Sequence, residues 1–307
     1  MQIAEQSVRA PHATPATPFV PIRFRAAEDF KSRPNYRDDL DHLQHKLHRI
    51  IGDYSFPKSA QIRCGLKECR TKHWHGGYVV ETVDGLETNI GADCGKKYFS
   101  VNWGDLQTAF DKAAADRDLR EWLQELLGRR SSLLSRAESA SRTLVTLSAR
   151  IQELEQKIRK EPLVNDEFAR VVQAGGIIRV ERAMSRDAAA AANIRQDQRS
   201  FWETIGRVQF LGALGCGAHI RDLLHVAVPS IQWLSEENLK GLDARGRREK
   251  SKTIDHATFI LTAAEEQIET AKGFLEPGNI RELAKLPVRR PNERARRILQ
   301  QLAAYSG

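Results

Sequence analysis

Three of the four cysteines in this chain lie between positions 64 and 94, and two histidines lie among them. Thiolates and imidazoles are the usual protein ligands of Zn²⁺, and ligands close together in sequence can reach one ion from a single tight turn. The spacing predicts a zinc site formed by Cys64, Cys69, His73 and Cys94, with His75 as the alternative to His73.

The ligand set favours a structural zinc ion over a catalytic one. Four protein ligands close the coordination sphere, whereas a catalytic zinc usually keeps one position open beside an acid or base. Glu68, Glu81 and Asp93 lie near the cysteines, but no pattern marks one of them as a general base. The His-Glu-x-x-His motif and the zinc-deaminase motif do not occur in the chain. We therefore expect a protein that is not an enzyme.

The segment between the histidines and Cys94 predicts the element that closes this site. Its sequence, GYVVETVDGLETNIG, alternates in polarity around Asp84-Gly85, a common hairpin turn. A β-hairpin would return the chain to its start and bring Cys94 back beside the first ligands. Gly91 and Gly95 flank that cysteine and allow a tight turn, and the next residues suggest the start of a helix.

The same stretch resembles small zinc-binding modules of uncharacterised phage and prophage proteins. Those modules combine a Cys/His cluster with a GxxCGKKxF-like element, which is GADCGKKYF at residues 91–99 here, and long helical segments follow them. The resemblance implies a mobile-element origin and no particular activity. The first cysteine pair departs from the usual knuckle, since four residues rather than two separate Cys64 from Cys69.

Helical patterns dominate the remaining sequence up to position 212. Residues 1–20 are rich in Pro, Ala and Thr and predict a disordered tail. Leu40, Leu43, Leu47 and Ile50 recur at helical spacing, which predicts an amphipathic helix over 36–52, within a segment 21–57. The zinc module then covers 58–103, and long helices cover 104–212, the first of them over 105–128.

Residues 131–161 carry an unbroken heptad pattern, which is typical of a coiled-coil seam. A similar pattern over 191–212 predicts that the two segments form an antiparallel coiled-coil hairpin, with pairing between two chains as the alternative. Gly175-Gly176 should end a helix between them, and Ile177–Val180 should form a short strand. The first seam comprises Leu133, Ala137, Ala140, Leu144, Leu147, Ile151, Leu154 and Ile158, and the second comprises Ala191, Ile194, Gln198, Phe201, Ile205, Val208 and Gly212.

Residues 213–307 predict a small bundle of short helices. One should precede Pro229, one should begin at Ser230, one should run from about Lys252 to Pro277, and a basic amphipathic helix should follow Pro291. The expected fold class is therefore mainly α, with a small β-hairpin zinc finger, an antiparallel coiled-coil hairpin and a short-helix bundle.

The charge balance favours an anionic partner. The net charge is +8 and the pI is about 9.4, and basic side chains next to aromatic ones can hold phosphate and stack on bases. We expect nucleic acid, DNA or RNA, to be bound mainly through its backbone. The candidate residues form three clusters, which are Arg63, Arg70, Lys72, Trp74, Lys96, Lys97 and Tyr98 around the zinc site, Arg245, Arg247 and Arg248 in a loop-like segment, and Arg289, Arg290 and Arg294 near the C-terminus.

Other partners and locations are restricted by composition. No run of about 18 apolar residues occurs, so we expect no membrane span, and no motif indicates a small-molecule substrate. Clustered cysteines are typical of a metal site in a reducing compartment, here the cytoplasm of a bacterial host cell. Cys216 is expected to be a small buried residue.

Three functions remain open from the sequence. The leading hypothesis is a non-enzymatic zinc-finger and coiled-coil protein that binds nucleic acid through its basic clusters. The second is an adaptor that acts on a host or phage protein through its coiled coil, with zinc purely structural. The third is a metal-dependent nuclease, for which the only candidates are His219, Asp222, His225 and His256.

Overall fold

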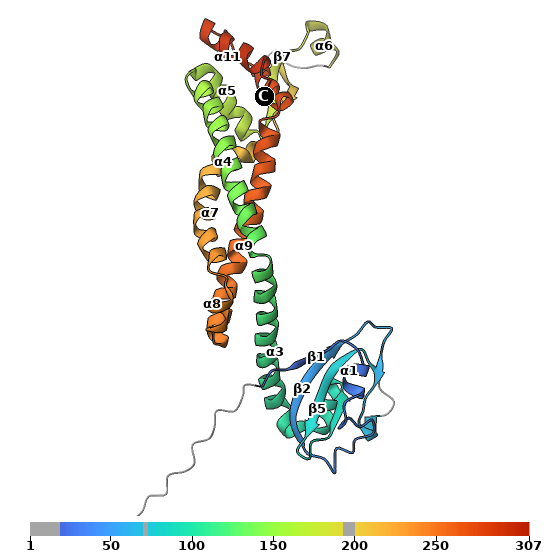
Figure 1. Cartoon of the computed structure of the whole chain (residues 1–307). Helices are drawn as coiled ribbons and strands as arrows, with labels where there is room; N and C mark the ends of the chain where they lie inside the picture. The colour runs from blue at the N-terminus through green and yellow to red at the C-terminus, as the bar shows by residue number, and fades with distance from the viewer. Residues whose placement is uncertain (1–18, 70–72, 193–199, 307) are drawn as a thin grey trace, which may run out of the picture. The chain divides into compact units, whose positions relative to one another are not determined.

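The computed structural model of the chain describes residues 19–69, 73–192 and 200–306 (Figure 1). It is mainly helical with small sheets, and it divides into two compact units, Met1–Leu123 and Gln124–Gly307. Within the described part of the chain, no helix is both long enough and apolar enough to cross a membrane. Nearly all of the tail expected over residues 1–20 lies outside the described residues.

The N-terminal unit contains a four-stranded sheet in the order β1-β2-β5-β6. Strand β1 (Ile22–Phe24) lies parallel to β2 (Leu47–Ser55), whereas β5 (Gly76–Thr82) pairs antiparallel with β2 and with β6 (Glu87–Ile90). Two short strands, β3 (Ile62–Arg63) and β4 (His73–Trp74), form a separate pair. The helices of this unit are α1 (Glu28–Lys31), the single 3₁₀ turn Lys67–Cys69, α2 (Ala92–Tyr98) and α3, which runs from Ser100 to Gly128.

Each face of the sheet has its own apolar core, because successive side chains of a strand point to opposite faces. Val80 and Ile90 pack on one face with Trp103 and Phe110 of α3. Val79 packs on the other face in an aromatic cluster with Phe24, Phe30, Tyr36, Tyr54 and Phe56. The thiols of the predicted metal site belong to the first core, so α3 and the sheet together enclose them.

The β-hairpin predicted between the histidines and Cys94 is present as β5 and β6, and Gly85 in its turn has φ of 82°. The helix predicted over residues 36–52 is wrong. Residues 47–55 form the central strand β2, and Leu43, which the helical pattern placed on the apolar stripe, is 81% exposed. Ile50 and Ile51 are both buried, one in each core, which a strand between two packed faces achieves and a one-sided helix does not.

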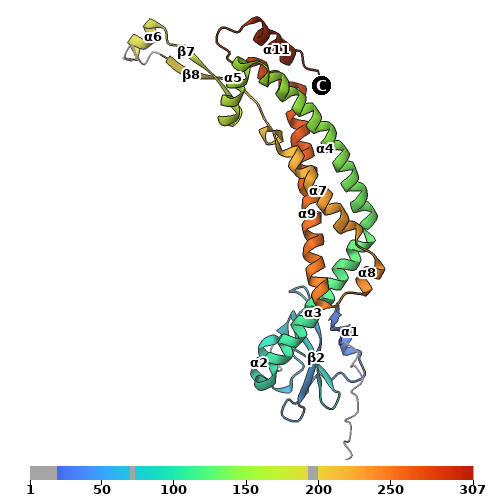
Figure 2. The same ribbon diagram turned by 90° about the vertical axis from the view of Figure 1, so that its left-hand side faces the viewer.

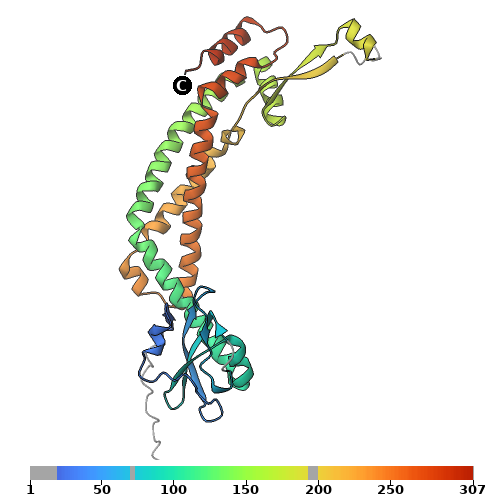
Figure 3. The same cartoon turned by 90° about the vertical axis from the view of Figure 1, so that its right-hand side faces the viewer.

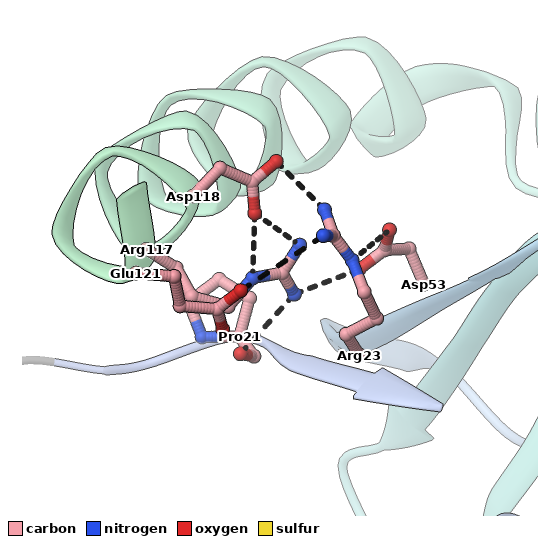
Figure 4. Close-up of polar contacts among 6 residues, drawn as sticks. All are labelled: Pro21, Arg23, Asp53, Arg117, Asp118 and Glu121. Carbon is pink, nitrogen blue, oxygen red and sulfur yellow. Dashed lines mark hydrogen bonds and ion pairs between the residues drawn. The ribbon is translucent and has the colours of Figure 1, made fainter. Parts of the chain in front are cut away.

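A polar network connects the first two strands with α3 (Figure 4). The buried Arg117 of α3 donates hydrogen bonds to Asp53 of β2 at 2.8 Å, to its neighbour Asp118 at 2.9 Å and to the carbonyl oxygen of Pro21 at 3.3 Å. Arg23 of β1 contacts the same two carboxylates, at 2.7 Å from Asp118 and 3.9 Å from Asp53. Each arginine therefore bridges the sheet edge and the helix.

Three long helices form the core of the C-terminal unit: α4 (Arg130–Arg159), α7 (Cys216–Gln232) and α9 (Ala244–Phe274). The helix predicted from the first heptad pattern is confirmed as α4, and all eight of its predicted seam residues are buried. They pack against α7 and α9, which lie alongside α4 in Figures 2 and 3.

The second arm of the predicted coiled-coil hairpin is wrong. Ser200–Arg207 forms strand β8, which pairs antiparallel with β7 (Ile177–Ala183), and Phe201 of the predicted seam is 46% exposed. Ile194 and Gln198 of that seam lie outside the described residues. A seam that contains Gln and Gly buries little apolar surface, whereas SFWETI is rich in aromatic and β-branched residues that favour strands.

Helix α5 (Pro162–Gln173) precedes this ribbon and ends where predicted, since Gly175 and Gly176 both have positive φ, at 66° and 90°. The strand predicted over 177–180 is confirmed within β7. The β7–β8 ribbon extends away from the helices and carries the short helix α6 (Arg186–Ala191) beyond β7 (Figures 2 and 3).

The remaining elements are short helices: the 3₁₀ turn Leu211–Ala213, α8 (Glu236–Lys240), α10 (Pro277–Glu282), the 3₁₀ turn Leu283–Lys285 and α11 (Glu293–Ala303). Three predicted boundaries are wrong. Helix α7 continues through Pro229, and Ser235 rather than Ser230 caps the next helix by accepting a hydrogen bond from the Asn238 amide at 3.2 Å. The predicted loop around Arg245–Arg248 is the first part of α9, because Asp243 caps that helix through the Gly246 amide at 2.7 Å.

Candidate metal centre

Three buried thiols converge in the N-terminal unit. Cys64 directly follows β3, Cys69 ends the 3₁₀ turn, and Cys94 lies in the first turn of α2. Their sulfur atoms all lie within 4.8 Å of one another, and those of Cys69 and Cys94 are 3.0 Å apart. All three are free cysteines, exposed by 1%, 5% and 2% respectively. Three close, buried sulfur ligands can hold a metal ion.

The backbone around Cys64 is fastened to strand β6. The Asn89 side chain donates to the Arg63 carbonyl oxygen at 2.9 Å, and the Gly65 amide donates to the Asn89 carbonyl oxygen at 2.8 Å. The next turn is closed by a hydrogen bond from the Cys69 amide to the Leu66 carbonyl oxygen at 3.0 Å. The hairpin that returns the chain to Cys94 thus also positions the first ligand.

Cys94 is positioned by two tryptophans that lie against its flanking glycines. The Trp74 ring occupies the space that a Cβ of residue 91 would need, and the Trp103 ring does the same at residue 95. A side chain at either position would displace an indole from the core. The two glycines that suggested a tight turn in the sequence therefore allow close packing of indole rings around the third thiol.

Burial raises the pKa of the Cys64 thiol and that of the Cys94 thiol; Cys69 raises the pKa of both further, and Cys64 also raises that of Cys94. Three thiolates in so small a volume repel one another, and the apolar surroundings do not solvate them. A bound cation would instead lower the pKa of these thiols, because its charge stabilises the deprotonated sulfur ligands. The donor chemistry fits a soft or borderline metal ion.

The structure does not bring a histidine to the thiols. His73 and His75 are both exposed, and within the described ranges no histidine, aspartate or glutamate has a ligand atom within 4.8 Å of all three sulfur atoms. The register explains this result, since His73 pairs with the exposed Arg63 and cross-strand partners share a face. Cys64 is the next residue after Arg63. The prediction of a histidine as the fourth ligand is therefore wrong, because neither His73 nor its alternative His75 lies at the thiols.

A second group of metal-capable side chains, missed in the sequence, lies beside Cys69. Ligand atoms of Asp41, His42 and Glu68 lie within 4.8 Å of one another. His42 Nδ1 is 3.0 Å from a Glu68 carboxylate oxygen, and Lys67 Nζ is 3.6 Å from Asp41. Because these groups pair with one another and with Lys67, they attach the loop around Asp41 to the cysteine turn.

The basic cluster around the thiols is only partly available to a partner. Arg63 pairs with Asp39 at 2.9 Å. Trp74 is half-buried and packs against the core, which leaves only part of its ring for stacking on bases. Lys96 and Lys97 are exposed, and the Lys97 ammonium lies 4.8 Å from the centre of the Tyr98 ring, which is half-buried. Arg70 and Lys72 lie outside the described residues.

The other two basic clusters, around Arg245 and around Arg289, also contain arginines that are buried or paired with carboxylates. Arg247 is buried and donates to the Leu242 carbonyl oxygen, so it supports the start of α9 and its predicted role in nucleic-acid contact is wrong. Arg245 pairs with Glu249 at 3.0 Å, and Arg289 pairs with Glu181 at 2.6 Å. The exposed cations of these clusters are Arg245, Arg248, Arg289, Arg290 and Arg294.

The residues considered for a nuclease site do not converge in the described part of the chain. Asp222, His225 and His256 are exposed on α7 and α9, and no metal-capable group of three is present there among the described residues. The side chains of His219 and Cys216 are not among those described.

Fold and site together define a mainly helical protein of two units, one of which encloses a three-cysteine cluster beside a four-stranded sheet. No protein-family model matches the chain. Searches of curated proteins and of solved structures find no significant match either.

Proposed function

We propose that Cys64, Cys69 and Cys94 hold a structural Zn²⁺ ion in a non-enzymatic protein that binds nucleic acid. The convergence of three buried thiols from three separate elements carries the proposal. Zn–S bonds of about 2.3 Å place tetrahedral sulfur ligands about 3.8 Å apart, so only small shifts would bring these sulfur atoms into position. A bound ion would also relieve the repulsion among the thiolates.

Metal analysis of the purified full-length protein tests the site. We expect one zinc per chain, lost in Cys94→Ser and retained in Cys216→Ser, which changes the cysteine outside the cluster. Matched His73→Ala and His75→Ala variants show whether either side chain moves in as the fourth ligand. A well-folded protein that binds no zinc, or a Cys94→Ser variant that keeps its zinc, would refute this assignment.

Nucleic-acid binding is supported by the net charge of +8 and by exposed cations in both units, among them Lys96, Lys97 and Arg248. Contacts with phosphates weaken steeply with salt, because each releases condensed counterions. Fluorescence anisotropy with labelled DNA and RNA over a salt series tests this function. Absence of binding even at low salt would refute it, and metal-dependent cleavage would refute the non-enzymatic assignment.

An adaptor function is the second candidate, favoured by large apolar side chains exposed on two helices of the C-terminal unit. Val226 of α7 is 67% exposed and Phe259 of α9 is 69% exposed. A protein captured from nuclease-treated bacterial lysate, and lost with Phe259→Ser, would favour an adaptor. The phage or prophage origin rests on the resemblance of residues 91–99, and the bacterial cytoplasm is proposed because free clustered thiols suit a reducing compartment.

A further inference from the structure

The β7–β8 ribbon exposes aromatic side chains that the fold does not bury. Phe201 is 46% exposed and Trp202 is 65% exposed. The two residues are adjacent in β8, so they project from opposite faces of the ribbon. The base of the ribbon is packed, since Ile178 is buried, but these two aromatic side chains stay exposed. Exposed tryptophan is enriched where proteins bind their partners.

Trp202 borders a groove of about 570 Å³ within the C-terminal unit. Its apolar lining includes Val171 of α5 and Ile177 of β7, and three arginines stand along it: Arg170, Arg179 and Arg289. Phe201 does not line this groove, which agrees with its position on the other face of the ribbon. The groove therefore combines one indole with several guanidinium groups.

The charges in the groove leave one arginine available. Arg170 pairs with Glu167 at 2.8 Å, and Arg289 pairs with Glu181 at 2.6 Å. The exposed Arg179 has neither a carboxylate within 4 Å nor a hydrogen-bond partner for its side chain, counting the residues that the structure describes. Beyond Arg289, which lines the groove, the chain continues into the exposed Arg290.

We propose that this groove binds single-stranded nucleic acid, with one base stacked on Trp202 and a neighbouring phosphate contacted by Arg179. Every base has a π-face, so an exposed indole in a positively charged groove stacks on bases with little sequence preference. A guanidinium group is well suited to phosphate because of its planar array of donors. The strand must be single, because a base inside a duplex cannot reach the ring.

The shape and charge of the groove favour a nucleotide chain over an acidic peptide. An acidic peptide would satisfy Arg179 but would leave the indole without a flat partner. The groove volume falls in the range of small-molecule ligand sites, about 300–1,000 Å³. This inference rests on the proposed nucleic-acid function and names the surface that carries it.

Anisotropy with labelled oligo-dT and oligo-U tests the site in the full-length protein. We expect Trp202→Ala to weaken binding by about 5- to 100-fold, the usual effect of removing a stacking aromatic. Phe201→Ala is the matched control on the opposite face and should stay within about twofold of the parent, since that face makes no contact in the proposed complex. Trp202→Phe should keep most of the affinity, and Arg179→Ala should reduce the slope of log affinity against log salt by about one.

The outcomes separate this inference from the proposed function. If the parent protein binds oligonucleotides and folded Trp202→Ala binds them equally well, the inference is wrong and the function stands. If the parent binds no nucleic acid, both fall. Binding of an oligo-glutamate peptide that depends on Trp202, without binding of oligo-dT or oligo-U, would also overturn the inference. Because Trp202 is exposed, circular dichroism should show an unchanged fold in these variants.

Discussion

Replacing Arg117 with methionine tests how strongly the polar network of Figure 4 stabilises the N-terminal unit. Its side chain is 7% exposed, and its guanidinium group contacts Asp53, Asp118 and the Pro21 carbonyl oxygen. Methionine keeps much of the length and the packing but removes every donor. The variant therefore isolates the polar contribution.

Breaking a buried ion pair usually costs about 3–5 kcal/mol, because the remaining partner is left uncompensated. Two observations place Arg117→Met near the lower end. The side chains of Asp53 and Asp118 are 29% and 44% exposed, so water solvates them in part. Arg23 also stays beside both carboxylates. We expect a loss of about 3 kcal/mol in the free energy of unfolding of this unit.

Hydrogen exchange followed by mass spectrometry measures this loss within one unit of the full chain. A loss of about 3 kcal/mol corresponds to about 150-fold faster exchange in the most protected peptides of β2 and β5. The control is Arg25→Met, which changes an exposed arginine of the same unit and should alter stability by less than about 0.5 kcal/mol. Acceleration of less than about fivefold in Arg117→Met would refute the reasoning.

The acid dependence of the same variant gives an independent readout. Burial opposes ionisation of Asp118, but hydrogen bonds from Arg117 and Arg23 outweigh it and hold the pKa of that carboxyl below its ordinary value. A lowered pKa adds stability at pH values above that of the unfolded group, about 3.9, and this stability is lost as the pH falls through the folded value. Arg117→Met should therefore lose stability less steeply on acidification than the parent protein.

Three further predictions concern single contacts. Leu144→Ala in the α4 seam should cost about 2–5 kcal/mol by thermal unfolding, because Leu144 is 1% exposed, whereas Val145→Ala, at a position 46% exposed, should cost much less. Burial raises the pKa of Tyr54 to about 12, so its neutral form stabilises the fold up to about pH 10 and that contribution is lost as the pH rises to 12; Tyr54→Phe should flatten this alkaline decline in denaturant titrations. Arg136 donates to both Glu265 oxygens, at 2.9 and 2.7 Å, but both side chains are about 40% exposed, so Arg136→Ala should cost at most about 1 kcal/mol, and less in high salt.

The spacing of apolar residues correctly predicted α4, because the buried stripe of this helix is set by residues within the helix itself. Every predicted seam position of α4 from Leu133 to Ile158 is buried, because a stripe at helical spacing needs an apolar partner whatever that partner is. The identity of the partner was not predictable in this way. Residues 191–212 repeat the spacing, yet α4 packs against α7 and α9. The predicted second seam contains Gln198 and Gly212, which offer little apolar surface for α4 to bury.

The β elements show the same limit. The turn at Gly85 was predictable because two residues determine it. The strand β2 was not, because leucines four and three positions apart fit a helix by coincidence, and only the neighbouring strands β1 and β5 make residues 47–55 extended.

The candidate metal site was also predictable only in the part that depends on local sequence. Cysteine is the residue type that most directly indicates a metal cluster, so Cys64, Cys69 and Cys94 were found from their spacing. The histidine was misassigned because its orientation depends on the pairing of His73 with Arg63, a register that no local pattern specifies. Trp202 lies in the segment 191–212, which was predicted to be helical with Phe201 in its seam, and it was not considered as a binding residue.

The order of the three long helices along the chain has a consequence for synthesis. Helix α4 is complete at Arg159, but the last residue of its partner α9, Phe274, is made 115 positions later. At translation rates of about 5–20 residues per second, the apolar stripe of α4 waits about 6–23 s for the helices that cover it. During that interval part of the stripe is uncovered, so a chain that ends before α9 should be prone to aggregation.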